Sequence, residues 1–271
     1  MRLKAFLLVL SLISQVFAQT LTNTQKVTID PLSVQSLFIE IFSGNTSMGT
    51  ATGFIYRYDN SDFLITNWHV VSGRDPNNNK IIDPLGRTPD KIGIWHNNKV
   101  LGSWARRFEV LYKNGKHLWK EHKNGRAIDV VALPITTIDD SLQIYPFDIK
   151  LSETDMIPQV GMPISIIGSP LGMSGPGKLA IWKTGHIATE PEVEFSGLPY
   201  FMVDATTRQG MSGSPVVLRL SGGYKTKSGG SVMSTSGIQT KFLGIYSGQW
   251  VVSEIGKVWL PKVIQEILVG N

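Results

Sequence analysis

The sequence predicts an all-β protein in which two antiparallel β-barrels pack together and a helix ends the chain. Short runs of β-branched and aromatic residues, each closed by turn residues, recur through two halves of the 271 residues. Glycine (27 residues) and proline (14 residues) are numerous enough for the many turns of such a fold. With 42% hydrophobic and 17% charged residues, the composition is that of a globular chain that buries a substantial core.

The N-terminus predicts a signal peptide over residues 1–18. Arg2 and Lys4 open it, residues 5–17 are mostly apolar but short for a membrane span, and cleavage is expected after Ala18. An uncleaved anchor is the alternative. We therefore expect a secreted or periplasmic protein with no stable membrane insertion after cleavage. The chain has no cysteine, which excludes disulfides, zinc–thiolate sites and cysteine nucleophiles.

A polar lead-in over residues 19–33 precedes the N-terminal barrel, which is predicted over residues 34–135. The strand-like runs of this barrel are residues 36–42, 50–58, 63–66, 91–95, 108–112 and 127–133, and residues 72–90 form a polar loop. Residues 113–126 form a second loop with five basic residues and one acidic residue. We interpret it as a solvated loop. Polyanion binding is the alternative, but no nucleic-acid motif accompanies the charges, so we expect no nucleic acid as a partner.

A linker over residues 136–160 is predicted to lead into the C-terminal barrel, residues 161–259. The strand-like runs of this barrel are residues 163–167, 179–182, 200–203, 215–220 and 242–246. Residues 221–236 are dense in glycine and serine and predict a mobile hairpin loop. A C-terminal helix is predicted over residues 260–271, because Pro261 suits a first helical turn and the apolar residues have helical spacing. These apolar residues are Leu260, Val263, Ile264, Ile267 and Leu268.

Ser212 is a candidate nucleophile because the glycines beside it, Gly210 and Gly213, allow a tight turn that brings backbone N–H groups close to a reacting carbonyl group. A serine nucleophile needs a base and an acid that orients the base. Of the five histidines, only His69 follows a strand within an apolar frame, and Asp129 interrupts an apolar run. Considered one at a time, these residues are better explained as ordinary structural residues. Ser212 would belong to a plain turn, His69 would be a buried histidine whose hydrogen bonds are satisfied, and Asp129 would lie on an edge strand and face water. Taken together, they indicate a catalytic site between the two halves.

Three segments resemble the motifs of trypsin-like (chymotrypsin-fold) serine proteases, most of all the bacterial HtrA-type and glutamyl-endopeptidase-like branch. These segments are Thr66–Val71, Ile128–Leu133 and Gly210–Pro215. The resemblance extends from about Phe38 to Leu268 and implies two packed six-stranded barrels. It also implies hydrolysis of peptide bonds through an acyl-enzyme intermediate. No PDZ-like domain is expected, because only the terminal helix fits after Trp259.

The resemblance implies a role for each residue of the site. His69 would act as the general base, Asp129 would orient it, and Ser212 would attack the carbonyl carbon of the substrate. The backbone N–H groups of Gly210 and Ser212 would form the oxyanion hole. The expected substrate-binding residues are Thr206, Thr207, Tyr246, Ser247 and Gly248, and Ser247 would also hydrogen-bond to Asp129. No cofactor and no metal is implied, and the expected partners are protein or peptide substrates.

The chain departs from the family pattern at Met211, where the digestive enzymes have an aspartate that pairs with a newly cut N-terminus. We therefore expect no activation by propeptide insertion. Ser214 replaces a usual glycine and should be tolerated because serine is small. No aspartate stands near Thr207, and Tyr246 stands where glutamyl endopeptidases have a histidine, so we expect a small or medium uncharged side chain before the scissile bond. The alternative to a serine endopeptidase is a catalytically silent binding protein of the same fold.

Overall fold

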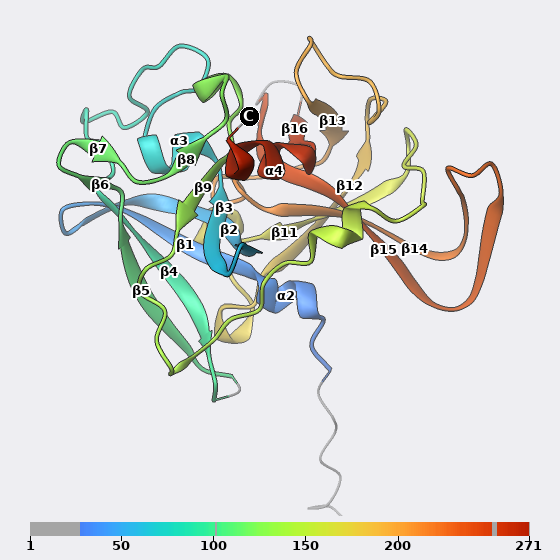
Figure 1. Cartoon of the computed structure of the whole chain (residues 1–271), viewed down its shortest axis with the longest axis horizontal. Helices are drawn as coiled ribbons and strands as arrows, with labels where there is room; N and C mark the ends of the chain where they lie inside the picture. The colour runs from blue at the N-terminus through green and yellow to red at the C-terminus, as the bar shows by residue number, and fades with distance from the viewer. Residues whose placement is uncertain (1–27, 101, 251–253, 271) are drawn as a thin grey trace, which may run out of the picture. The chain divides into compact units, whose positions relative to one another are not determined.

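The computed structural model describes residues 28–100, 102–250 and 254–270. The predicted signal peptide, residues 1–18, lies outside the described residues, as does the lead-in up to residue 27. Residues 31–271 form one compact unit whose regular structure is mainly β-strand (Figure 1). A five-residue helix, α2 (Pro31–Gln35), comes directly before the first strand. Across the described part of the chain, no helix has the length and apolar character needed to cross a membrane.

The first half of this unit is an antiparallel sheet in the order β10-β4-β1-β2-β3-β9-β8, with β5 paired to β4. Its strands are β1 (Ser36–Ser43), β2 (Thr46–Tyr58), β3 (Ser61–Thr66), β4 (Lys91–Asn98), β5 (Trp104–Val110), β8 (Lys120–Glu121), β9 (Val131–Pro134) and β10 (Leu142–Gln143). β6 (Tyr112–Lys113) and β7 (Lys116–His117) pair only with each other. The strand β10 and the 3-10 helix η2 (Ile149–Ser152) lie within the predicted linker.

The second half is a closed barrel of six strands in the order β11-β12-β13-β16-β15-β14. Its strands are β11 (Pro163–Gly168), β12 (Ile181–Ile187), β13 (Tyr200–Asp204), β14 (Pro215–Lys225), β15 (Ser231–Trp250) and β16 (Ile255–Trp259). Three short 3-10 helices lie in the connections: η1 (Gly125–Ala127), η3 (Pro170–Gly172) and η4 (Pro176–Lys178). The predicted all-β double-barrel fold with a C-terminal helix is confirmed. The second half is the closed six-stranded barrel that was predicted, whereas the first half is an eight-stranded sheet and not a closed six-stranded barrel.

Alternation along the strands divides the buried residues into three clusters. In β2, Phe54 joins the cluster that lies between the two halves, whereas its neighbour Ile55 joins the cluster inside the first sheet. β15 behaves in the same way, since Phe242 faces the shared cluster and Leu243 faces the interior of the second barrel. Successive side chains of a strand point to opposite faces, so each strand contributes to two cores. The shared core fixes the two halves against each other at the place where the site lies.

The C-terminal helix α4 (Lys262–Val269) completes the shared core. Val263, Ile264, Ile267 and Leu268 are buried in it, as their helical spacing predicts. The helix ends at Gly270, whose φ of 80° is the left-handed conformation that commonly closes helices.

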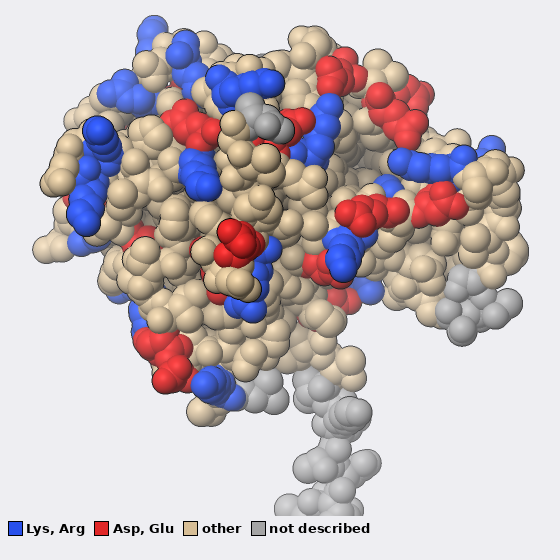
Figure 2. All heavy atoms as spheres, in the orientation of Figure 1, with Lys and Arg blue, Asp and Glu red and all other residues tan. Residues whose placement is uncertain are grey.

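The predicted basic loop is partly folded and holds α4 in place. Lys120 Nζ donates a hydrogen bond to the carbonyl oxygen of Leu268 (3.3 Å), and His122 Nε2 lies 3.2 Å from Glu266 Oε2. On the face drawn in Figure 2, basic side chains gather at the upper left, while acidic side chains lie among basic ones over the rest of the face.

Two local predictions were wrong. Residues 221–236 do not form a loop, because β14 and β15 continue as a paired ribbon that includes the pairs Tyr224↔Val232 and Ser221↔Ile238 (Figure 1, right). Backbone hydrogen bonds hold a ribbon together whatever its side chains are, so its glycine and serine content did not reveal it. Asp129 lies before β9, which begins at Val131, and not inside a strand.

Candidate active site

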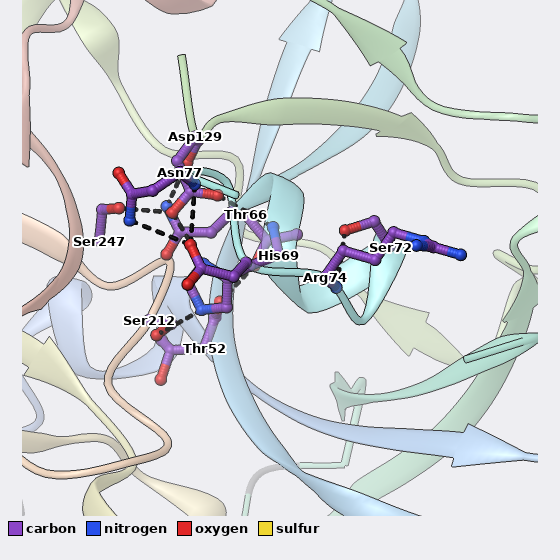
Figure 3. A network of polar contacts seen from close by, with 11 residues as sticks. Thr52, Thr66, His69, Ser72, Arg74, Asn77, Asp129, Ser212 and Ser247 are labelled. Atoms are coloured by element: carbon purple, nitrogen blue, oxygen red, sulfur yellow. Dashed lines mark hydrogen bonds and ion pairs between the residues drawn. The ribbon is translucent and has the colours of Figure 1, made fainter. Parts of the chain in front are cut away.

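The structure brings His69, Asp129 and Ser212 together in one hydrogen-bonded chain (Figure 3). His69 lies in α3 (Trp68–Ser72), a single helical turn that follows β3 directly. Asp129 lies between η1 and β9, and Ser212 lies in the turn between β13 and β14. The first two residues therefore come from the first sheet and the third from the second barrel.

Local sequence explains why α3 is short. Asn67 has an extended backbone (ψ 152°) and ends the strand, and Gly73 takes a left-handed φ of 66° that stops the helix after one turn. A Cβ atom at residue 73 would lie 2.4 Å from the ring of Pro89, so this turn requires glycine. His69 is thus fixed to a rigid element directly after a buried strand.

Asp129 is a buried carboxylate with its charge fully hydrogen-bonded. Its side chain is only 3% exposed. It accepts hydrogen bonds from the backbone N–H of His69 (2.9 Å), from His69 Nδ1 (2.7 Å) and from Ser247 Oγ (2.5 Å). The bond from Ser247 is the one that the sequence predicts. Because the carboxylate only accepts, His69 must carry its proton on Nδ1, which leaves Nε2 free to accept.

His69 Nε2 lies 2.9 Å from Ser212 Oγ, within reach of the hydroxyl proton. Burial alone would lower the pKa of His69, but the charge and hydrogen bond of Asp129, together with the charge of Asp75, outweigh it and raise the pKa above its ordinary value. Asp75 belongs to the polar loop after α3 and was not found from the sequence. Its carboxylate lines the same 290 Å³ pocket as His69.

Two further residues support Asp129 and were also missed. Asn67 Nδ2 donates a hydrogen bond to the backbone carbonyl oxygen of Asp129 (2.6 Å) and so ties the end of β3 to the start of β9. Lys257 lines the pocket beside His69 and Asp129, and its ammonium group lies over the rings of Tyr200 (4.4 Å) and Trp259 (5.1 Å). Burial lowers the pKa of Lys257, while the charge of Asp129 opposes that shift. Only Asn67 had a sequence signal, since it stands two residues before the histidine.

The turn around Ser212 is tightly built. Gly210 has φ 92° and Gly213 has φ 84°, conformations that favour glycine. Within the part of the chain that the structure describes, the N–H groups of Gly210 and Ser212 donate to no protein atom. The two predicted oxyanion-hole donors are therefore available to a ligand.

A pocket of about 490 Å³ opens beside Ser212, lined by Thr207, Arg208, Gln209, Ser212, Tyr246, Gly248 and Glu254. Of the predicted substrate-binding residues, Thr207, Tyr246 and Gly248 line this pocket, and Ser247 lines the pocket beside His69. Thr206 is exposed and lines neither pocket. The side chains of Thr207 and Tyr246 are buried and hydrogen-bond to each other.

Chemically, this arrangement can transfer a proton from Ser212 to His69 while a carbonyl group binds at the N–H groups beside the serine. No group of three histidine, aspartate or glutamate side chains among the described residues is placed to hold a metal ion.

Comparisons with known proteins agree on the fold. A family model described as a trypsin-like peptidase domain matches residues 51–222. A serine endoprotease from Yersinia pestis has a similar solved structure, with a TM-score of 0.51 and 15% sequence identity over 90% of this chain and 67% of that one. An inactive form of the Rv3671c protease from M. tuberculosis H37Rv gives a TM-score of 0.45 and 15% identity, over 88% of this chain and 89% of that one. No curated protein matches the chain.

Proposed function

The chain belongs to the trypsin-like peptidase family of serine proteases, and from that premise we propose that it is an endopeptidase whose catalytic residues are His69, Asp129 and Ser212. One observation carries the proposal. The hydrogen bonds run without interruption from Asp129 to His69 (2.7 Å) and from His69 to Ser212 (2.9 Å). This order of acid, base and nucleophile is the one that acyl transfer by serine requires.

In the proposed mechanism, Ser212 Oγ attacks the carbonyl carbon of the scissile peptide bond while His69 Nε2 takes the hydroxyl proton. The negative oxygen of the tetrahedral intermediate binds at the N–H groups of Gly210 and Ser212. His69 then gives its proton to the leaving amine nitrogen, and the C–N bond breaks to leave an acyl-enzyme. A water molecule then attacks the carbonyl carbon of the acyl-enzyme while His69 Nε2 takes a proton from it. The ester bond to Ser212 Oγ breaks as His69 returns the proton to Ser212, and the carboxylic acid product is released.

Asp129 holds the imidazole ring in one tautomer and stabilises the imidazolium that forms. Three donors support this role, because they bind the carboxylate oxygens and fix the direction of the carboxylate. Ser247 contributes one of them from β15, so the acid is held from both halves of the molecule.

We also propose that, once the signal peptide has been removed, the protein works without any further cut within residues 19–40. Met211, the residue before the nucleophile, is apolar and fully buried, so it offers no charge to a newly formed N-terminus. The basic and apolar character of residues 1–18 supports export, and the substrates would then be proteins or peptides outside the cytoplasm.

A labelling experiment tests the proposed function. Purified protein is exposed to a fluorophosphonate probe at pH ~8, above the ordinary pKa of histidine, and casein hydrolysis is measured in parallel. Ser212→Ala should abolish labelling and lower hydrolysis by about 10,000-fold or more. Ser228→Ala, in the exposed turn between β14 and β15, should label like the wild type. Folded wild-type protein that neither labels nor cleaves would instead identify a silent binding protein of this fold.

A further inference from the structure

Thr52 lies at the junction of the two halves and touches the nucleophile turn at two points. It belongs to β2 of the first sheet and has no exposed surface. Its N–H donates to the carbonyl oxygen of Ser212 (2.9 Å), and its Oγ1 donates to the carbonyl oxygen of Gly210 (2.7 Å). Figure 3 shows Thr52 close to Ser212, below His69 in this view.

The same hydroxyl group also accepts a hydrogen bond. The N–H of Ser169 donates to Thr52 Oγ1 at 3.1 Å, so one oxygen atom joins the nucleophile turn to the end of β11. Only a group that donates and accepts at once can do this, which among side chains of this size means serine or threonine. On the opposite side, Thr66 Oγ1 donates to the carbonyl oxygen of Thr52 (2.8 Å) and fixes the backbone of Thr52 itself.

The turn after Ser169 holds the other peptide plane beside Gly210. Leu171 donates its N–H to the carbonyl oxygen of Gln209 at 2.6 Å and adopts a left-handed φ of 54°, which is uncommon for leucine. In a trans peptide the C=O and the N–H point in opposite directions. With the carbonyl oxygen of Gln209 bound to Leu171, the N–H of Gly210 must therefore point away from that turn and toward the side where a substrate carbonyl would bind.

Both peptide planes that flank Gly210 are thus fixed, one by Leu171 and one by Thr52. The fit is tight, because a Cβ atom at residue 210 would lie 2.2 Å from the carbonyl oxygen of Ser169. If the carbonyl oxygen of Gln209 were released, its peptide group could rotate and carry the N–H of Gly210 out of the oxyanion hole. If the carbonyl oxygen of Gly210 were released, the next peptide group would be free to turn, and the φ and ψ angles of Gly210 could then change and move the same N–H indirectly.

We propose that Thr52 is a positioning residue for the reaction, and that its hydroxyl group, by bridging Gly210 and Ser169, keeps the oxyanion hole open. The inference rests on the proposed function, since it assigns Thr52 a part in the chemistry of Ser212. Thr52 acts through the backbone of Gly210 and does not touch the substrate.

Three variants test the inference by steady-state hydrolysis of a peptide substrate. Thr52→Val keeps the shape and removes the hydroxyl group, Thr52→Ser keeps the hydroxyl group, and Thr46→Val makes the same change at the exposed end of the same strand. Thr52→Val should lower kcat by about 10- to 100-fold, less than the ~100- to 1,000-fold cost of deleting an oxyanion-hole donor outright. KM should change by less than about threefold, because the hole acts mainly in the transition state. Thr52→Ser and Thr46→Val should stay within about threefold of the wild type.

The pH profile separates positioning from general disruption. The acid limb of kcat/KM, which reports His69, should stay in place in Thr52→Val, because the hydrogen bonds of His69 are untouched. The inference is overturned if Thr52→Val keeps wild-type kcat, if Thr52→Ser fails to rescue it, or if the acid limb moves with the loss of rate.

A measurement without turnover keeps this inference distinct from the proposed function. The amide NMR signal of Gly210 should be single in the wild type and in Thr52→Ser, and broadened or doubled in Thr52→Val. If the wild-type protein proves inactive but the signal responds in this way, the proposed function fails and the role of Thr52 in holding the loop stands. If the signal is the same in all three proteins, the inference about Thr52 fails.

Discussion

The hydroxyl groups of Thr207 and Tyr246 hydrogen-bond to each other in the pocket beside Ser212. Both side chains are 1% exposed, and burial raises the pKa of Tyr246 to about 12. The buried wall that Thr207 and Tyr246 form is therefore polar but uncharged throughout the working range of pH, whereas the charged lining residues, Arg208 and Glu254, are exposed to solvent. A charged substrate side chain that entered it would lose its water without meeting a buried counter-ion there.

We predict that peptides with an uncharged side chain before the scissile bond are cleaved about 10- to 100-fold faster than those with Asp, Glu, Lys or Arg at that position. A peptide library measured at pH 7 and again at pH 10 checks this, and the ranking should be the same at both values because Tyr246 stays protonated. Tyr246→Phe should shift the ranking toward apolar side chains. Equal cleavage of charged and uncharged peptides would contradict this assignment of the pocket.

Asp75 should set part of the pH dependence of the reaction. Its negative charge favours the imidazolium form of His69 and raises the pKa of that residue. In Asp75→Asn the pKa of His69 should fall, so the neutral base is present at lower pH and the acid limb of kcat/KM moves to lower pH. Asp59→Asn, a change of the same kind in the exposed turn before β3, should leave the limb in place.

Asp75 also accepts hydrogen bonds from the backbone N–H (2.8 Å) and Nδ2 (3.0 Å) of Asn77, and asparagine retains one acceptor for them. The quantity to compare between the wild type and Asp75→Asn is therefore the pH at which kcat/KM falls on the acid side, and not the absolute rate. An unmoved limb in Asp75→Asn would show that this charge does not act on the base.

His96 should make the protein less stable in mild acid. Burial lowers the pKa of His96 to about 4, while the unfolded chain titrates near the ordinary value of 6.5. Between these values the unfolded state binds more protons than the folded state, so the free energy of unfolding falls as the pH falls, by up to about 1.4 kcal/mol per pH unit. Above pH 6.5 this contribution is fully present.

Urea denaturation at several pH values measures this effect. His96→Asn should give a flatter dependence between pH 6.5 and pH 4 than the wild type. The same substitution at the exposed His117 is the matched control and should keep the wild-type slope. If His96→Asn and the wild type have the same slope, the buried histidine is not the source of the acid sensitivity.

Gly168 and Ser214 should be energetically coupled. Ser214 Oγ occupies the place beside Gly168 where a side chain would otherwise lie, since a Cβ atom at residue 168 would be 2.1 Å from it. Gly168→Ala should therefore lower the free energy of unfolding by about 1–3 kcal/mol. Adding Ser214→Gly should recover part of the loss, because the crowding atom is removed, although Thr52 Oγ1 at 2.7 Å keeps some of the strain.

A double-mutant cycle of thermal unfolding gives the coupling between these two residues. Strictly additive effects would contradict the close contact. The pair also explains how the chain accommodates the serine that departs from the family pattern: the neighbouring strand β11 provides a glycine at the point of contact.

The sequence predicted that His69, Asp129 and Ser212 belong to one site because of their combination and the resemblance to trypsin-like proteases, since each local signal alone was better explained by an ordinary structural residue. Ser212 lies between two glycines, His69 follows an apolar strand, and Asp129 interrupts an apolar run. Runs of β-branched and aromatic residues that end at turn residues likewise predicted most of the strands. The helix α4 had both its apolar spacing and Pro261 as signals.

Thr52 and Asp75 could not be predicted in the same way. Each is an ordinary polar residue in its own segment, and its role depends on contacts with residues far away in the sequence, Gly210 for Thr52 and His69 through space for Asp75. Thr206 and Thr207 are neighbours with the same side chain, and only the course of the backbone decides that the second one is buried in the pocket. The β14–β15 ribbon depends on pairing, which composition does not encode.

Because the site is divided between the two halves, it is completed only late in the synthesis of the chain. Thr52, His69 and Asp129 are synthesised first, Ser212 follows, and α4 reaches back to β8 through the bonds to Leu268 and Glu266. Until Ser212 has been synthesised, the chain holds His69 and Asp129 without the nucleophile that we propose. Under the proposed function, the site is therefore complete only after the second barrel has formed around Ser212.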